Sequence, residues 1–562
     1  PRDAEAALQR LLSSRLAARR RLAQGLVALS VSSLYGYPGS EWERIGYPGP
    51  LGDPPAEPRR LEPLRITADE VMNCDVVVVG SGAGGGCVAA GLAGAGLDVI
   101  VVEKGSYNSE ADFTHLEPAS TQSMYLYGQT LATVDLSCQI LAGSTLGGGT
   151  VVNYATSFRT PEHVLREWAE SSGIDAFASG EFEESLDEVS ERLGVNTNSS
   201  AAGRRDALLE DGLKKLGWHV DMMPRAVRGC TQDEQCGYCG FGCRVGAKQS
   251  SMRTYLEDAA AHGARLVVDA EVRRVSVVEG RATGIEAVSD GHSLVINASG
   301  VVAAAGAIET PALLLRSGLR GEVGRGLHLH PGTGALALFD DEVRMWEGTT
   351  QARYSNEFRH WDGGYGPILE TVPIHPGAGS TALPWISSSS HRDLMGRFSN
   401  VGFCAVLPRD KGSGRVRVAR DGTPRVHYTM SAEDERRVAE GVVAAARVME
   451  AAGAREVFAP HSDFISYVPG TPGAHQHWAE ETRRIGYRSG RVTTFSFHQM
   501  GSCRMGSDPA RSAVDPDNET HEVRGLYVTD ASCFPTASGV NPMLTVYAIA
   551  NRAAKRITAR LA

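Results

Sequence analysis

The sequence lacks any hydrophobic run of the ~18–20 residues that a membrane-spanning helix needs. It also lacks an excess of basic residues, since 56 Lys and Arg stand against 66 Asp and Glu, and the net charge is −10. Nucleic-acid-binding proteins need a concentrated basic face, so this class is excluded. The 10 cysteines are too few for a disulfide scaffold, and the scattered placement of six of them is typical of a reducing compartment. We therefore expect a cytoplasmic protein whose partners are small molecules.

The N-terminal region combines a basic helix with a proline-rich segment. Leucines recur at helical spacing over residues 1–30, with arginines between them. Residues 22–34 are apolar and follow three arginines, as in a signal peptide, but no small-residue cleavage site comes after them. We interpret the segment as a helix packed on the body of the protein, and the alternative is a peripheral membrane contact made by this basic helix. Residues 36–65 are rich in Pro and Gly and predict an extended linker.

Many of the 64 glycines cluster, and the first cluster predicts a dinucleotide-binding loop. The β-branched run DVVVVG ends at Gly80, as a buried parallel strand would, and a helix-forming stretch follows. Gly80 permits a tight turn, Gly82 lets the backbone approach a pyrophosphate, and Gly85 lets helix and strand pack closely. Free N–H groups at the helix N-terminus can bind the phosphates. Glu103 ends the next apolar run and can bind a ribose diol, but this pattern does not separate FAD from NAD.

Four further blocks accompany this fingerprint. GSTLGGGTVVNY (143–154) is a second glycine-rich turn, and VVAAAGAIETPALLLRSG (301–318) predicts a strand ending at Gly306 and a helix opened by Thr310-Pro311. Near the C-terminus come FHQMGSCRMG and GLYVTDASCFPTASGVNPMLTVYAIANRAA. In this order the blocks resemble the glucose–methanol–choline (GMC) oxidoreductase family over residues 74–562. The IGYPGP, CGYCGFGCRVGAKQSSMRTYL and GRGLHLHPGT blocks resemble its long-chain (fatty) alcohol oxidase branch.

The resemblance implies an α/β fold, in which a Rossmann-like FAD-binding domain joins a second, antiparallel-sheet substrate domain. Non-covalent FAD is expected, because Val151 and Val152 occupy the stretch in which some family members tether FAD through a histidine. The expected segments are an N-terminal helix and wrapping segment (1–73), the FAD-binding domain (74–160 and 225–340), a helical insertion (161–224), the substrate-binding domain (341–490) and a C-terminal segment that completes the FAD domain and active site (491–562).

The resemblance also places His498 and Asn541 at the reacting centre, facing the N5 edge of the flavin. A hydride leaves an alcohol carbon more easily once the hydroxyl has lost its proton, and histidine is suited to accept that proton. An asparagine amide can donate to the developing alkoxide and orient the substrate. Val272 matches the strand that meets the adenine, and Asp530 matches a position that holds the flavin. The full set of expected cofactor contacts is Gly80, Gly82, Ala83, Gly84, Gly85, Glu103, Lys104, Gly147, Gly148, Gly149, Thr150, Asn153, Val272, Gly306, Asp530, Ala531, Pro542, Met543 and Thr545.

We therefore predict FAD-dependent oxidation of a long-chain or apolar primary alcohol to the aldehyde, by proton abstraction and hydride transfer to flavin N5. The expected electron acceptor is O2, which would give H2O2. One alternative is a dehydrogenase of the same fold that passes electrons to a quinone or protein acceptor, through a Cys-ligated cluster. Another is a tailoring oxidoreductase that acts on a specialised metabolite or sterol. A light-driven decarboxylase or a lyase would not need the His498–Asn541 pair, which argues against that class.

Two groups of residues resemble metal ligands. The densest cysteine cluster consists of Cys230, Cys236, Cys239 and Cys243. Its spacing is compatible with iron–sulfur or zinc ligation, with one or more disulfides, or with buried free thiols that pack as small hydrophobic side chains. We favour free thiols. His328 and His330 resemble a metal pair without a third ligand, so we expect a structural role for them and predict no metal site.

Overall fold

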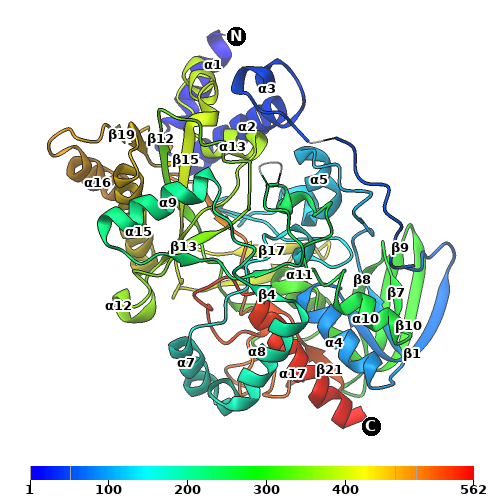
Figure 1. The fold of residues 1–562 in the computed structure, drawn as a ribbon. Coiled ribbons are helices and arrows are strands. Elements are labelled where there is room, and N and C mark those ends of the chain that lie inside the picture. The colour runs from blue at the N-terminus through cyan, green and yellow to red at the C-terminus, as the bar shows by residue number, and fades with distance from the viewer. Residues whose placement is uncertain (1, 51, 234–235, 463, 489, 562) are drawn as a thin grey trace.

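The computed structural model describes residues 2–50, 52–233, 236–462, 464–488 and 490–561, and these contain two large sheets (Figure 1). The first sheet has the order β7-β2-β1-β10-β9-β8, with β21 paired to β10. Strands β1, β2, β7, β10 and β21 pair in parallel, whereas β8, β9 and β10 form an antiparallel meander. The strands are β1 (Glu70–Val79), β2 (Val99–Val102), β7 (Arg265–Val267), β8 (Glu271–Val278), β9 (Arg281–Ser289), β10 (His292–Ala303) and β21 (Leu526–Val528).

Helices cover the first sheet and bury its parallel strands. Valines 76–79 of β1 are at most 5% exposed, as expected for a strand buried on both faces. Helix α4 (Ala83–Gly94) packs against α10 (Tyr255–Ala261) and α17 (Met543–Leu561). A Cβ at Gly91 would come within 2.6 Å of the Ala554 Cβ, so this glycine allows the close approach of α4 and α17. The predicted Rossmann-like domain is confirmed.

The second sheet is antiparallel throughout and has the order β19-β18-β12-β15-β14-β13-β5. Helix α15 (Ala432–Ala451) packs on β12 and β15, and α9 (Arg204–Leu216) packs on α15. Strands β5 and β12 both belong to this sheet. We therefore propose that the substrate-binding domain begins before β12 and not at residue 341. The strands are β5 (Asp221–Met222), β12 (Thr333–Leu338), β13 (Arg353–Ser355), β14 (Ile368–Glu370), β15 (Val401–Leu407), β18 (Glu456–Phe458) and β19 (Ser466–Tyr467).

Helix α11 (Gly306–Arg316) corrects a sequence prediction. The preceding strand ends at Ala303 rather than at Gly306, and Pro311 lies inside the helix instead of in its first turn. Proline has no N–H, so the carbonyl of Ala307, four residues earlier, loses its helical partner. The Ser502 hydroxyl donates to that carbonyl at 2.6 Å. This hydrogen bond explains how the helix tolerates an internal proline.

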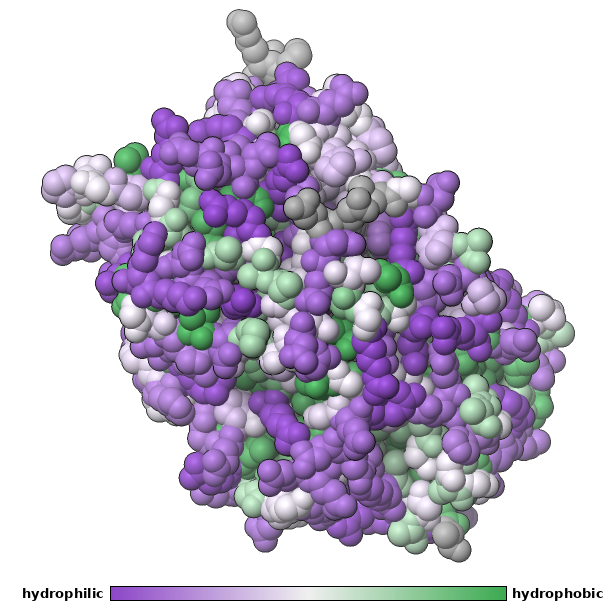
Figure 2. Space-filling model, viewed as in Figure 1, coloured by the Kyte–Doolittle hydropathy of each residue, from purple (hydrophilic) through white to green (hydrophobic). Residues whose placement is uncertain are grey.

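The N-terminal helices lie at one end of the molecule (Figure 1). Helix α2 (Ala17–Gly36) packs on α13 (Pro376–Ala382), but Leu22, Leu26 and Leu29 on its other side are 59, 47 and 65% exposed. No helix among the described residues is long and apolar enough to cross a membrane. Hydrophilic residues predominate on the face drawn in Figure 2. The two further helices of this region are α1 (Arg2–Leu12) and α3 (Ser40–Ile45).

Shorter elements connect the two sheets. Strands β3 and β20 pair in parallel, β4 pairs with β6, and β11, β16 and β17 form a small antiparallel sheet. These strands are β3 (Cys138–Ile140), β4 (Val195–Asn196), β6 (Arg225–Ala226), β11 (Arg325–Leu327), β16 (Gly414–Val418), β17 (Pro424–His427) and β20 (Thr494–Ser496). The remaining helices are α5 (Glu117–Met124), α6 (Gly149–Val152), α7 (Glu162–Ser172), α8 (Gly180–Arg192), α12 (Trp361–Gly364), α14 (Ser388–Met395) and α16 (Ala474–Ile485), with 3₁₀ turns η1 (Leu126–Gln129), η2 (Asp175–Ala178), η3 (Cys239–Phe241), η4 (Phe398–Asn400) and η5 (Ala531–Cys533).

Candidate active site

A cavity of about 470 Å³ is lined by residues of both sheets. The first sheet contributes Val79 and Val102, the last residues of β1 and β2. The second sheet contributes Glu370 of β14 and Phe403 and Val406 of β15. Ligands of parallel α/β sheets bind beyond the carboxyl ends of the strands, so the cavity lies where a cofactor is expected.

The first glycine-rich turn forms part of the cavity wall. Gly80 has a φ of +99°, which favours glycine, and a Cβ there would overlap the carbonyl of Ala304. A Cβ at Gly85 would overlap the carbonyl oxygen of Gly80, so Gly85 serves the close packing of helix and strand. At Gly82, in contrast, an added Cβ would meet only the Cα of Gly148, at 3.9 Å. Packing within the protein therefore does not require glycine at position 82.

Glu103 follows β2 and is fixed by the same turn. Its carboxylate accepts hydrogen bonds from the Ser81 hydroxyl at 2.6 Å, the Ser81 N–H at 3.1 Å and the Gly105 N–H at 2.8 Å. Burial raises the pKa of Glu103, and these hydrogen bonds oppose the rise. The Gly147 N–H donates to the Ser81 hydroxyl oxygen at 2.8 Å, which joins the second glycine-rich turn to the first. The carboxylate is thus preorganised at the cavity wall.

Asp530 links two further segments of the wall. Its carboxylate accepts from the Gly306 N–H at 2.7 Å, from the Thr310 hydroxyl at 2.5 Å and from the Ser532 N–H at 2.8 Å. Burial raises the pKa of Asp530, and these donors oppose that rise. The side chain therefore ties the beginning of α11 to the turn η5.

Three of the predicted cofactor contacts do not line the cavity. These are Gly85, Gly147 and Thr545, whose buried hydroxyl is hydrogen-bonded to that of Thr160 at 2.8 Å. We assign packing or hydrogen-bonding roles to these three instead of cofactor contacts. The predicted residues that do line the cavity are Gly80, Gly82, Ala83, Gly84, Glu103, Lys104, Gly148, Gly149, Thr150, Asn153, Val272, Gly306, His498, Asp530, Ala531, Asn541, Pro542 and Met543.

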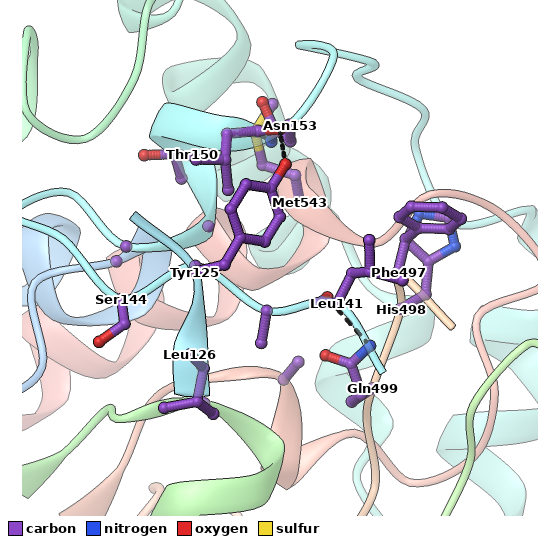
Figure 3. A pocket seen from close by; sticks show the side chains of 18 of the residues that line it. Tyr125, Leu126, Leu141, Ser144, Thr150, Asn153, Phe497, His498, Gln499 and Met543 are labelled. Atoms are coloured by element: carbon purple, nitrogen blue, oxygen red, sulfur yellow. Dashed lines mark hydrogen bonds between the residues drawn. The ribbon is translucent and has the colours of Figure 1, made fainter. Parts of the chain in front are cut away.

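The cavity is lined by His498 and by its neighbours in the sequence, Phe497 and Gln499, and all three are labelled in Figure 3. Its Nδ1 lies 3.5 Å from the Nδ1 of His330. Burial lowers the pKa of His498 well below the usual value of 6.5, and the neighbouring imidazole adds to the shift. Burial likewise lowers the pKa of His330 to about 4. At neutral pH His498 is therefore uncharged, with one ring nitrogen able to accept a proton.

Asn541 lies in the same wall, as do two polar residues that the sequence motifs do not reveal. Its side chain is buried, and its Oδ1 has no hydrogen-bond partner. Glu370 Oε1 also lacks a partner, whereas Gln351 Nε2 donates to the other carboxyl oxygen at 3.0 Å. Glu370 and Gln351 belong to no family block and come from the second domain. Only the three-dimensional structure brings them to Asn541.

The cysteine cluster lies behind the cavity wall, and its four members are free thiols. Within the described part of the chain, no group of three or more side chains is arranged to bind a metal ion. Buried Lys248 donates to the carbonyls of Val151, Asn153 (2.8 Å) and Cys239 (2.7 Å). Lys248 thereby connects the second glycine-rich turn to the cysteine loop. His328 lies 3.6 Å from the carboxylate of Asp410.

Comparisons with known families agree with this geometry. Models described as GMC oxidoreductase match residues 121–332 and 408–550, and a model described as FAD binding domain matches residues 75–115. The segment 121–332 includes the second glycine-rich turn, and the segment 408–550 includes His498 and Asn541. The segment 75–115 includes the first glycine-rich turn.

Similar proteins and structures extend the agreement to most of the chain. A long-chain-alcohol oxidase of Arabidopsis thaliana is 37% identical over 505 residues, which are 86% of this chain and 68% of the relative. The paromamine 6'-oxidase of Streptomyces fradiae is 26% identical, over 88% of this chain and 93% of that protein. The crystal structure of pyridoxine 4-oxidase from Mesorbium loti has a TM-score of 0.66 at 19% identity, covering 86% of this chain and 99% of its own. That likeness shows the fold.

Proposed function

This chain belongs to the GMC oxidoreductase family, and we propose that it oxidises an alcohol to the aldehyde at a centre formed by His498 and Asn541. FAD is its cofactor. The observation that carries the proposal is that the turn at Gly80 and the His498–Asn541 pair, which are far apart in sequence, line one cavity.

The residues present suit FAD along the length of the cavity. The N-terminus of α4 and the open space at Gly82 suit the pyrophosphate, and the fixed carboxylate of Glu103 suits a ribose diol. Bound there, FAD supplies the two-electron acceptor for the hydride that leaves the alcohol carbon. We propose that it is held non-covalently, because Val151 and Val152 occupy the place of a tethering histidine.

His498 and Asn541 divide the work at the reacting oxygen. Uncharged His498 accepts the hydroxyl proton as the alcohol is oxidised. The Asn541 amide donates to the same oxygen as its negative charge develops, and so holds the carbon at a near-attack distance. Asn541 is buried and His498 is partly buried in the cavity wall, which limits the water that competes for these hydrogen bonds.

The substrate that we propose is a long-chain or apolar primary alcohol. Apolar side chains form much of the cavity wall beyond the reacting pair, which suits a hydrocarbon chain. They include Leu126, Val372, Ile374, Phe403 and Leu407. The naming of several similar plant proteins as long-chain-alcohol oxidases supports the same substrate class.

A panel of primary alcohols of increasing chain length tests this proposal. We expect kcat/KM to rise by about tenfold for roughly every two added methylenes that the cavity buries, at about 0.8 kcal/mol each. Equimolar H2O2 would identify O2 as the acceptor. Activity only with a quinone or dye would indicate the dehydrogenase alternative. Oxidation confined to polar polyols would contradict an apolar substrate and favour a tailoring enzyme.

We also propose that α2 makes a peripheral contact with a membrane surface. Leu22, Leu26 and Leu29 form an exposed apolar stripe, and Arg15 and Arg19 beside it are exposed as well. An apolar stripe with flanking arginines suits an anionic lipid surface. Helix α13, on which α2 packs, lines the cavity, so this contact would place the cavity close to membrane-dissolved substrate.

Changing the three exposed leucines of α2 to serine together should weaken binding to vesicles of phosphatidylcholine and phosphatidylserine by about tenfold or more. The cause is the loss of apolar area that could enter the interface. Cosedimentation measures the change, and Val71→Ser, at an exposed position of β1, is the matched control. Equal sedimentation of the triple variant and the unmodified protein would refute the membrane contact.

A further inference from the structure

Helix α13 borders the cavity at the side of the second domain. Lining residues recur along the chain from Glu370, at the end of β14, through Val372 and Ile374 to Ala378 and Ala382 of α13. In Figure 1, α13 lies beside α2 at the N-terminal end of the molecule, away from α4 and α17. The phosphates of FAD are proposed to bind at the N-terminus of α4, so the region bordered by α13 is left for the substrate.

This helix presents two small apolar side chains to the cavity. Ala378 and Ala382 are four residues apart, so they lie on the same face of α13. Both line the cavity, and neither is buried by other side chains, since Ala378 is exposed and Ala382 is half-buried. Cavity space therefore lies in front of both methyl groups.

The position of α13 is fixed by close contacts with its neighbours. One carboxylate oxygen of Glu117 accepts from the Gly377 N–H at 2.8 Å, and the other accepts from the Ala378 N–H at 2.6 Å. A Cβ at Gly377 would overlap the Glu117 carboxylate, and a Cβ at Gly379 would overlap the ring of Phe398. Because packing is this close on two sides, α13 has little room to move.

His375, the residue before α13, fixes the beginning of the helix. Its Nε2 donates to the carbonyl of Gly237 at 3.1 Å, which leaves Nδ1 to accept from the Tyr47 hydroxyl at 2.9 Å. Tyr47 belongs to the IGYPGP block, and the Tyr238 hydroxyl donates to the carbonyl of Gly49 in the same block at 2.7 Å. The N-terminal segment and the cysteine loop thus both support this wall of the cavity.

We propose that α13 limits the length of the alcohol that the cavity accepts, with Ala378 and Ala382 as specificity-determining residues. This inference rests on the proposed oxidation of long-chain alcohols. With the hydroxyl end of the substrate at His498 and Asn541, the hydrocarbon tail extends along the second-domain wall to the face of α13. Methyl side chains leave room there for the tail. Since α13 is held by its neighbours, a larger side chain at either position takes that room from the substrate.

The test is the ratio of kcat/KM for n-dodecanol to kcat/KM for n-butanol, measured with the FAD-loaded protein. Ala378→Phe and Ala382→Phe should each lower this ratio by about tenfold or more, because the ring displaces two or more methylenes that contribute about fourfold each. A ratio is independent of the fraction of active enzyme. Ala378→Val should lower it less, and provides the same test if the larger side chain prevents folding.

Ala119→Phe is the matched control, since Ala119 is exposed on the neighbouring helix α5 and is not part of the cavity lining. Its ratio should equal that of the unmodified enzyme. The inference is overturned if the ratio is unchanged in either alanine variant of α13, or if Ala119→Phe lowers it as much. Failure of the unmodified enzyme to oxidise either alcohol would instead defeat the proposed function itself, and this inference with it.

Discussion

Replacing His498 with alanine should slow flavin reduction by alcohol about 10²–10⁴-fold, while FAD remains bound. The imidazole is the group that we propose to accept the hydroxyl proton, and burial keeps it uncharged and ready to do so. Each tenfold loss corresponds to about 1.4 kcal/mol of transition-state stabilisation. The main contacts proposed for the phosphates and ribose, at Gly82 and Glu103, lie on other segments, so cofactor affinity should change little.

Anaerobic stopped-flow measurement of the FAD absorbance at saturating alcohol tests this expectation. His262→Ala, at an exposed histidine near the end of α10, is the control and should reduce at the rate of the unmodified enzyme. Reduction of His498→Ala at nearly the unmodified rate would show that another group accepts the proton. Loss of bound FAD would mean that the imidazole supports the cofactor site rather than the reaction.

Gly82→Val is expected to give a folded protein that retains less than about a tenth of its FAD. Gly82 has φ −65° and ψ −161°, an extended conformation that residues other than glycine adopt. A Cβ at this position meets no protein atom closer than 3.9 Å. The Cβ of the valine therefore fits without displacing protein atoms, and we expect the side chain to occupy the space proposed for the pyrophosphate.

The contrast with Gly85 makes this prediction specific. A Cβ at Gly85 would overlap the carbonyl oxygen of Gly80, so Gly85→Val should destabilise the folded domain itself. The ratio of flavin to protein absorbance, together with circular dichroism and thermal melting, separates the two outcomes. A full complement of FAD in Gly82→Val would rule out our placement of the pyrophosphate.

The sequence predicts best those parts of the fold in which the conformation of one short segment limits which residues that segment can contain. The turn at Gly80 needs a positive φ, and Gly85 needs the absence of a side chain, so both residues are readable without any knowledge of distant segments. The strand before Gly80 is recognisable because burial on both faces requires continuous apolar residues.

Features that depend on distant partners could not be predicted in this way. The sequence pattern predicts a helix start at Pro311, since nothing in it indicates that Ser502 compensates for the missing N–H of the proline. Similarly, the apolar sequence of β12 would suit a strand of either sheet. Only its pairing with β15 assigns it to the second sheet. Glu370 is one of many carboxylates in the sequence. It stands out only in the structure, where its Oε1 and the Oδ1 of Asn541 both lack a hydrogen-bond partner and both residues line the same cavity.

The last strand of the first sheet, β21, has a consequence for how the enzyme is made in the cell. It pairs with β10 across more than two hundred residues of intervening chain, and both Asp530 and Asn541 come after it in the sequence. A ribosome that has translated the first glycine-rich turn has therefore produced only part of the cavity, and the other part is still to be synthesised. Capture of the flavin in its final setting must therefore wait until the segment through Asn541 has left the exit tunnel.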